Sequence, residues 1–146
     1  MEVLADTGYL GLFLAAFLAA TVLPLSSEVV LGILLAHEYH PVFAVGVATV
    51  GNVLGAVLNY YLGVLGSTIV FKKILRVSEQ SLVKAENRFR QYGVFSLLFA
   101  WVPVIGDPLT IVAGMVKVRF SIFLVLVCIG KCLRYIFIAW AFLAAQ

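Results

Sequence analysis

Four ionisable side chains lie inside otherwise apolar stretches of this 146-residue chain. Two are acids, Glu28 and Asp107, and two are bases, Lys131 and Arg134. Charges in apolar segments are costly, and they usually pair with each other or mark the path of a substrate or a proton. Lys131 and Arg134 are three residues apart, so they share one face of a helix. The four side chains are therefore either a neutralising set, for example with Asp107 paired to Arg134, or an anion site.

Proline interrupts the two apolar stretches that carry the acids, and helices rarely continue through such segments. Asp107 before Pro108 has the form of a helix N-cap with proline at the first helical position, and Ser26 or Ser27 would cap the helix that follows Pro24. A helix N-terminus presents free amide groups and a positive dipole end, which attract phosphate. The candidate hairpin tips are Pro24, Pro103, Gly106 and Pro108.

These features together predict a site for an anionic head group near the tips. The two bases would bind the anion, and the two acids would carry protons that drive the cycle. Asn52 and Asn59 share a face of one apolar helix, where buried amides need partners, so we expect them to bond to a hairpin. The candidate substrate-binding or coupling residues are Glu28, Asp107, Lys131, Arg134, Asn52 and Ser27.

The elements that hold these residues belong to a membrane protein. Hydrophobic residues make up 64% of the chain and charged residues 12%, and the mean hydropathy is +1.13, which is far from a soluble domain's balance. About 20 helical residues span a bilayer core of about 30 Å, so the second and fourth apolar stretches are predicted spans. The four stretches are 8–36, 41–71, 94–116 and 120–145.

The third stretch is predicted to be a re-entrant hairpin, because each arm beside its break covers only about half of the hydrocarbon core. The alternative is a proline-kinked spanning helix. Between the second and third stretches, a polar segment places apolar residues at helical spacing after a plausible cap at Ser78, which predicts an amphipathic helix on the membrane surface. Those apolar residues are Leu82, Ala85, Phe89 and Tyr92.

An internal repeat appears when the sequence is shifted so that Pro24 falls on Pro103, an offset of 79 residues. We predict an all-α fold in one membrane domain, 1–146, with repeat one at about 8–71, a linker at about 72–93 and repeat two at about 94–145. Each repeat crosses the membrane an odd number of times, so the second copy is inverted. The same shift places Glu28 on Asp107, Gly51 on Gly130, Asn52 on Lys131 and Gly55 on Arg134.

Other residues favour packing over chemistry. Small residues along the first spanning helix suit close helix contacts. The segment His37–His40 is expected to be a solvated turn, and Cys128 and Cys132 are expected to be packing residues. We find no nucleotide-binding glycine loop, no Ser-His-Asp order and no metal-ligand set, so we expect no enzyme, no cofactor, no metal and no nucleic-acid partner. The glycines are Gly46, Gly51, Gly55, Gly63 and Gly66.

The order of these motifs resembles the DedA family, also called the SNARE-associated or VTT domain family, and within it the small YqaA-like branch. The resemblance covers nearly the whole chain, and its most specific part lies in the second half. It rests on Leu23-Pro24, Ser27 to Leu31, Gly51-Asn52, Tyr92-Gly93, Trp101 to Val104, Gly106-Asp107, Ala113-Gly114, Gly130-Lys131 and Arg134-Tyr135.

The resemblance implies a multi-pass protein of the bacterial inner membrane with two opposed re-entrant hairpins. It also implies the movement of phospholipids or undecaprenyl phosphate between leaflets, often coupled to protons. The chain departs from the main branch at the second-half proline, where Ala100-Trp101 and Gly106-Asp107 stand in place of arginines. Lys131 and Arg134 would then supply the phosphate contacts from the last helix.

Three functions remain open from the sequence. The first is a translocase of an anionic lipid, with membrane lipids and protons as partners and a homodimer favoured by polar hairpin tips. The second is a transporter of a small ion or solute that uses Glu28 and Asp107. The third is a membrane scaffold whose charges are structural.

The basic residues predict the topology. Six of them lie in 72–90 and two follow the second hairpin, so the central loop is expected in the cytoplasm and both termini outside. With Cys128 and Cys132 replaced by alanine, an impermeant thiol reagent added outside should label a cysteine at Tyr39 and miss cysteines at Lys84 and Lys117. The reverse pattern would invert the topology. Strong outside labelling at position 117 alone would mean that the third stretch spans.

Overall fold

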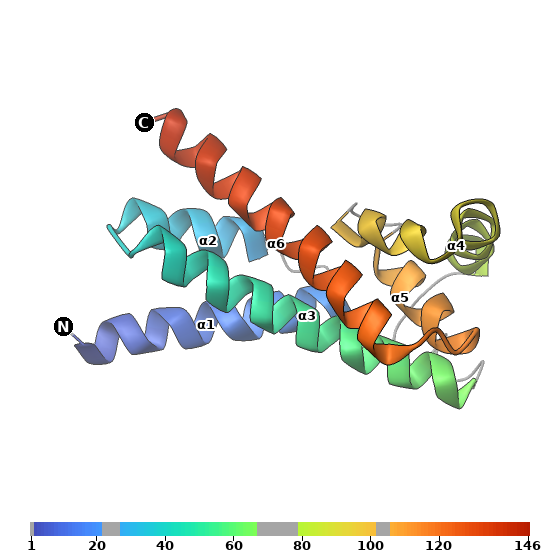
Figure 1. Cartoon of the computed structure of the whole chain (residues 1–146). Coiled ribbons are helices and arrows are strands. Elements are labelled where there is room, and N and C mark those ends of the chain that lie inside the picture. The colour runs from blue at the N-terminus through green and yellow to red at the C-terminus, as the bar shows by residue number, and fades with distance from the viewer. Residues whose placement is uncertain (1, 22–26, 67–78, 102–105) are drawn as a thin grey trace. The chain divides into compact units, whose positions relative to one another are not determined.

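Every regular element that the structure describes is a helix, which confirms the predicted all-α class. The computed structural model describes residues 2–21, 27–66, 79–101 and 106–146. The elements in chain order are α1 (Glu2–Thr21), α2 (Ser27–Ala36), α3 (Pro41–Leu65), α4 (Glu79–Tyr92), the 3-10 helix η2 (Gly93–Trp101), α5 (Gly106–Met115) and α6 (Phe120–Ala144) (Figure 1).

The helices α3 and α6 are the two predicted spans. Each has 25 residues, with mean hydropathy of 1.9 and 2.2 in their most apolar windows. At 1.5 Å per residue, each is about 37 Å long, which exceeds the hydrocarbon core of about 30 Å. Their outer faces carry large exposed apolar side chains such as Val42, Phe137 and Trp140. Lipid is the solvent that suits such faces, because a large apolar patch is unfavourable in water.

The residues form two compact units. Unit 1 comprises Met1–Gly55 and Lys131–Gln146, and unit 2 comprises Ala56–Gly130. Each unit therefore contains one broken helical hairpin together with a segment of each long helix. In unit 1 the arms are α1 and α2, which pack against each other, and in unit 2 they are η2 and α5, which do the same. The predicted breaks at Pro24 and Pro103 lie outside the described residues.

The arms differ in length between the two hairpins. In unit 2, η2 has nine residues and α5 has ten, close to the predicted half-core length. In unit 1, α2 also has ten residues, but α1 has 20, of which Thr7–Ala20 is apolar. That apolar part is about 21 Å long, more than half of the core and less than all of it. Re-entrance remains a prediction for both hairpins.

The core of unit 1 joins all four of its helices. Leu12 and Ala16 of α1 pack with Leu31 of α2, Ala48 of α3 and Tyr135 of α6. At one end of the unit, the ring of Tyr9 on α1 meets that of Tyr39 in the α2–α3 turn, with centroids 5.2 Å apart. Figure 1 shows the start of α1, this turn and the end of α6 at the same end of the unit.

In unit 2, α4 packs on α5 and η2. The predicted amphipathic helix is confirmed, because Ala85 and Phe89 pack on Leu109 and Val112 of α5, while Lys84 and its polar neighbours are exposed. This part of its apolar face is therefore covered by protein and is not open to a lipid surface. The predicted cap, Ser78, lies outside the described residues.

Two of the predicted packing glycines make close contacts and two do not. A Cβ atom at Gly51 would clash with the carbonyl of Phe13 on α1, and one at Gly63 would clash with the carbonyl of Ile111 on α5. Gly46 has no such neighbour within 4 Å. Gly66 also has none, and it lies just past the end of α3 with φ of +67°, a conformation that glycine adopts at helix ends.

Equivalent contacts recur in the two units at the offset of 79 residues. Gly51 lies against the first arm of its hairpin at Phe13, and Gly130 lies against the first arm of the other at Leu98. The second arms also correspond, because Gly32 of α2 faces Phe142 of α6, and the equivalent residues Ile111 and Gly63 face each other in unit 2. Two copies of one structural unit would make such paired contacts. Their inverted orientation stays a prediction.

The contact of α3 with α5 should be intolerant of one added methyl group. A Cβ atom at Gly114 would clash with the carbonyl of Tyr60 and lie 3.1 Å from the Cα atom of Gly63. We expect Gly114→Ala to lower the free energy of unfolding by about 1–3 kcal/mol, the usual cost of overpacking. Thermal unfolding in detergent measures it. The control Gly46→Ala should be neutral or slightly stabilising, and equal losses in the two variants would contradict this close contact.

Candidate functional site

The start of α2 is fastened to the middle of α6 by two polar contacts in unit 1. The hydroxyl groups of Ser27 and Tyr135 are 2.8 Å apart, and Glu28 forms an ion pair with Arg134. Neighbouring residues on one helix thus meet neighbouring residues on the other. We call these four side chains the α2–α6 clamp.

The helical geometry gives the two contacts different environments. Consecutive residues on a helix point about 100° apart, so the two pairs cannot face the same way. Ser27 is 2% exposed and Tyr135 is fully buried, which places their hydrogen bond in the core. The side chains of Arg134 and Glu28 are 21% and 26% exposed. The ion pair therefore lies at the edge of the packed core, where another molecule can reach it.

The electrostatics of the clamp suit an exchange of anions. Glu28 lies in the first turn of α2, where the helix dipole stabilises a negative charge. A guanidinium group has five N–H donors in a planar fork, more than one carboxylate accepts, and phosphate oxygens fit the same fork. Arg134 therefore has donors for a phosphate group beside Glu28 or in its place.

Two expectations about this region are corrected. The alternative of a purely structural set paired Arg134 with Asp107, whereas Arg134 pairs with Glu28. Ser27 was a candidate cap, but it is the first residue of α2 and its hydroxyl bonds to Tyr135. Ser26, the other candidate cap, lies outside the described residues. The correction has one cause, because packing of α2 on α6 brings together residues more than 100 positions apart.

Asn52 is buried beside α1 in the same unit. Its Nδ2 atom donates to the carbonyl of Ala16 at 3.0 Å, and this bond fixes which way the amide points. Its Oδ1 atom is buried and accepts no hydrogen bond from the described residues. Asn59, in unit 2, donates to the hydroxyl of Thr110 at 3.2 Å. Each amide thus bonds to a hairpin arm, in line with the expectation that these amides bond to the hairpins.

The remaining candidates are placed separately. Lys131 is buried in the part of α6 that belongs to unit 1. Asp107 is half-buried in unit 2, where its carbonyl accepts a bond from the hydroxyl of Thr110. Because α5 begins at Gly106, Asp107 lies inside the first turn and not at the N-cap as expected. Gly106 and Pro108 are buried in that turn.

The sequence did not single out Tyr135 or Thr110 as polar partners. A tyrosine in an apolar helix has the pattern of a core residue, and the repeat places Tyr135 on Ala56, so it offers no signal either. In the α2–α3 turn, His37 and His40 are exposed, as expected. Among the described residues, no three His, Cys, Asp or Glu side chains gather as they would around a metal ion.

A helical chain with two apolar helices of spanning length and a clamped acid–base pair is a multi-pass membrane protein. The VTT domain family profile matches residues 23–143. The chain belongs to this family, which is also known as the DedA family.

Relatives share most of the chain. Inner membrane protein YqaA of Escherichia coli is 40% identical over 131 residues, which cover 89% of this chain and 87% of that protein. An uncharacterised protein of Haemophilus influenzae is 32% identical, over 86% of this chain and 81% of its own. A protein of Lactococcus lactis named alkaline phosphatase-like is 29% identical, over 89% and 67%. No solved structure matches the chain significantly.

The buried hydroxyl pair should contribute measurably to stability. Tyr135→Phe leaves the Ser27 hydroxyl without this partner, which we expect to cost about 1–3 kcal/mol. Ser27→Ala in the same protein should recover part of that loss, because no buried donor then lacks a partner. Detergent melting of the two single variants and the double variant forms a double-mutant cycle. Strictly additive losses would show that the two hydroxyl groups are not coupled.

Proposed function

We propose that this protein is a translocase that moves an anionic lipid, a phospholipid or a lipid similar to undecaprenyl phosphate, between the leaflets of the bacterial inner membrane. The observation that carries the proposal is the Glu28–Arg134 ion pair, at the edge of the core beside the first turn of α2. The location in the inner membrane is supported by the name of the Escherichia coli relative.

The chemistry of the pair supports an exchange step. A lipid phosphate would take the guanidinium of Arg134 by two parallel hydrogen bonds, and Glu28 would accept a proton as it loses its partner. The phosphate then replaces the carboxylate as the counter-ion, so no unpaired charge is left in the low-dielectric interior. Release of the lipid would return the proton and restore the ion pair. This cycle couples lipid movement to protons without a metal or a cofactor.

Other residues support the same site. Lys131 brings a second positive charge on the same helix, three residues before Arg134, and a buried lysine is costly unless it serves a pair or a ligand. The Oδ1 atom of Asn52, which accepts no hydrogen bond from the described residues, suits the O–H of a protonated phosphate. Asp107 holds the position in unit 2 that Glu28 holds in unit 1, and we assign it the matching role in the second half of the cycle.

The proposal includes re-entrant hairpins in an inverted repeat. The recurring contacts at the offset of 79 residues support two copies of one unit, and the half-core length of α2 and α5 supports helices that begin near the midplane. Helix N-termini at that depth would face the lipid phosphate. The central loop would lie in the cytoplasm and both termini outside.

A membrane scaffold is the second candidate, because an ion pair that fastens α2 to α6 needs no substrate. Transport of a small ion or solute through the acids is a third. Reconstitution into vesicles that contain a fluorescent anionic lipid distinguishes them. The translocase should change the leaflet exposure of the labelled lipid, the transporter should move its solute without that change, and the scaffold should do neither.

The function of the pair is tested by one set of variants. We expect Arg134→Gln to retain its melting temperature within a few degrees, because Glu28 is exposed enough to take up a proton, and to abolish lipid exchange in the vesicles. Glu28→Gln with Arg134→Gln should remain inactive although no charge is unpaired. Arg119→Gln, at an exposed arginine in unit 2, is the matched control and should keep full exchange.

A structural pair has a different signature. Loss of one partner would then leave an uncompensated charge and cost about 3–5 kcal/mol, and the double variant would regain most of the stability and the activity. Recovery of lipid exchange in the double variant would therefore overturn the assignment of Arg134 to the substrate.

A further inference from the structure

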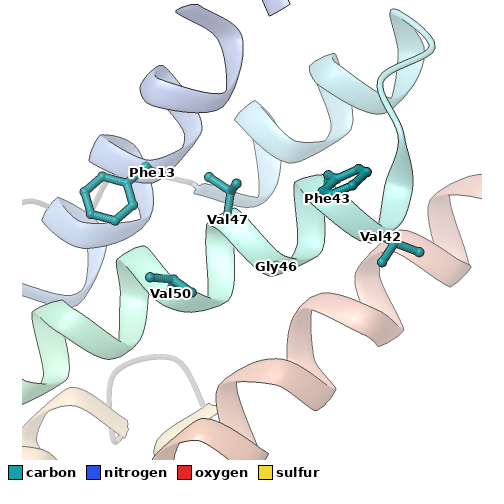
Figure 2. Close-up of a pocket in the computed structure, with 6 residues that line it drawn as sticks. All are labelled: Phe13, Val42, Phe43, Gly46, Val47 and Val50. Atoms are coloured by element: carbon teal, nitrogen blue, oxygen red, sulfur yellow. The ribbon is translucent and has the colours of Figure 1, made fainter. Parts of the chain in front are cut away.

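An apolar groove lies on unit 1, between the first half of α3 and one residue of α1 (Figure 2). Its volume is about 300 Å³. No charged or polar side chain lines it, and all but one of its residues come from α3. The lining residues are Phe13, Val42, Phe43, Gly46, Val47 and Val50.

The groove exists because Gly46 has no side chain. A Cβ atom at this position would have no neighbour within 4 Å, so the space above the backbone is open. Val42 and Val50 lie one helical turn before and after Gly46 on the same row, and Phe43 stands beside it. Val42, Phe43 and Val50 are all largely exposed. The glycine is thus a notch whose walls are large apolar side chains.

The shape and chemistry of the notch restrict what fills it. Ordered water needs polar partners, which the lining side chains do not offer. A second helix approaches closely where small residues recur every four positions, whereas here both positions four residues away from Gly46 are valine. An empty groove would forfeit dispersion contacts on every wall. A thin, flexible hydrocarbon chain meets these conditions.

The position of the groove puts such a chain within reach. It occupies positions 42–50 of a helix of spanning length that begins at Pro41, so it extends about 12 Å from the helix start. That distance is less than half of the hydrocarbon core. We propose that the groove is a binding site for one acyl chain of a membrane lipid from the leaflet on the side of the α2–α3 turn. This site does not depend on the translocase function.

Quenching by brominated lipid tests the site in the full-length protein. With Trp101 and Trp140 replaced by phenylalanine, a single tryptophan is introduced at Phe43 in the groove or at Phe137 on α6. These two residues are matched, because each is 66% exposed. Titration of the detergent-purified protein with a phospholipid brominated on its acyl chains should quench the groove reporter saturably at stoichiometric lipid. The reporter at 137 should lose fluorescence only in proportion to the lipid added.

Filling the notch should remove the saturable phase. Gly46→Leu occupies the groove, whereas Gly11→Leu adds the same side chain at an exposed α1 glycine that also has no neighbour within 4 Å. We expect the first change to make the titration linear and the second to leave it saturable. If Gly46→Leu does not fold, judged by circular dichroism and gel filtration, Gly46→Val replaces it.

Two results would overturn the proposal. The first is equal, proportional quenching of the reporters at 43 and 137. The second is a saturable signal that survives filling of the notch or that depends on protein concentration and not on lipid, since a second copy of the chain would then cover this face.

Discussion

The attachment of α2 to α6 is the constraint on which the arrangement of unit 1 depends. A ten-residue helix is too short to span a bilayer and too short to be stable alone, so its position is set by what it packs against. The buried Ser27–Tyr135 hydrogen bond and the Glu28–Arg134 ion pair fix its first turn on α6. Leu31, further along α2, then joins the apolar core of the unit. Polar contacts thus set the register of this helix, and apolar burial stabilises it.

Unit 2 solves the same problem with almost no charge. The corresponding short helix, α5, approaches α3 at Gly63 and Gly114, where the two backbones lie in direct contact. Close backbone approach, together with the Asn59–Thr110 bond, replaces the clamp of unit 1. The repeat has therefore kept the placement of its helices while the two copies diverged in the interactions that hold them. Only the unit with the ion pair retains a base opposite its acid.

The sequence predicted the elements better than their partners. The spans α3 and α6 followed from apolar length, and the ends of the short arms followed from proline, because both signals are local. The pair of Arg134 with Glu28 was not singled out, since it joins residues more than 100 positions apart and depends on packing. Tyr135 was missed because a buried tyrosine in an apolar helix has the pattern of a core residue. Glycine spacing predicted close packing at Gly51 and Gly63 and failed at Gly46, where composition does not reveal which face a residue occupies.

The failure at Gly46 and the success at Gly63 have one physical explanation. A glycine in a membrane helix removes a side chain and leaves a notch, and the neighbours on the same row decide what fills it. Gly63 lies opposite Gly114, so a second backbone enters. Gly46 lies between Val42 and Val50, so no backbone can approach and the hydrocarbon of the bilayer is the remaining occupant. In a chain this short, protein and lipid thus compete for the same kind of notch, and the outcome at each glycine determines whether that surface belongs to the fold or to the membrane.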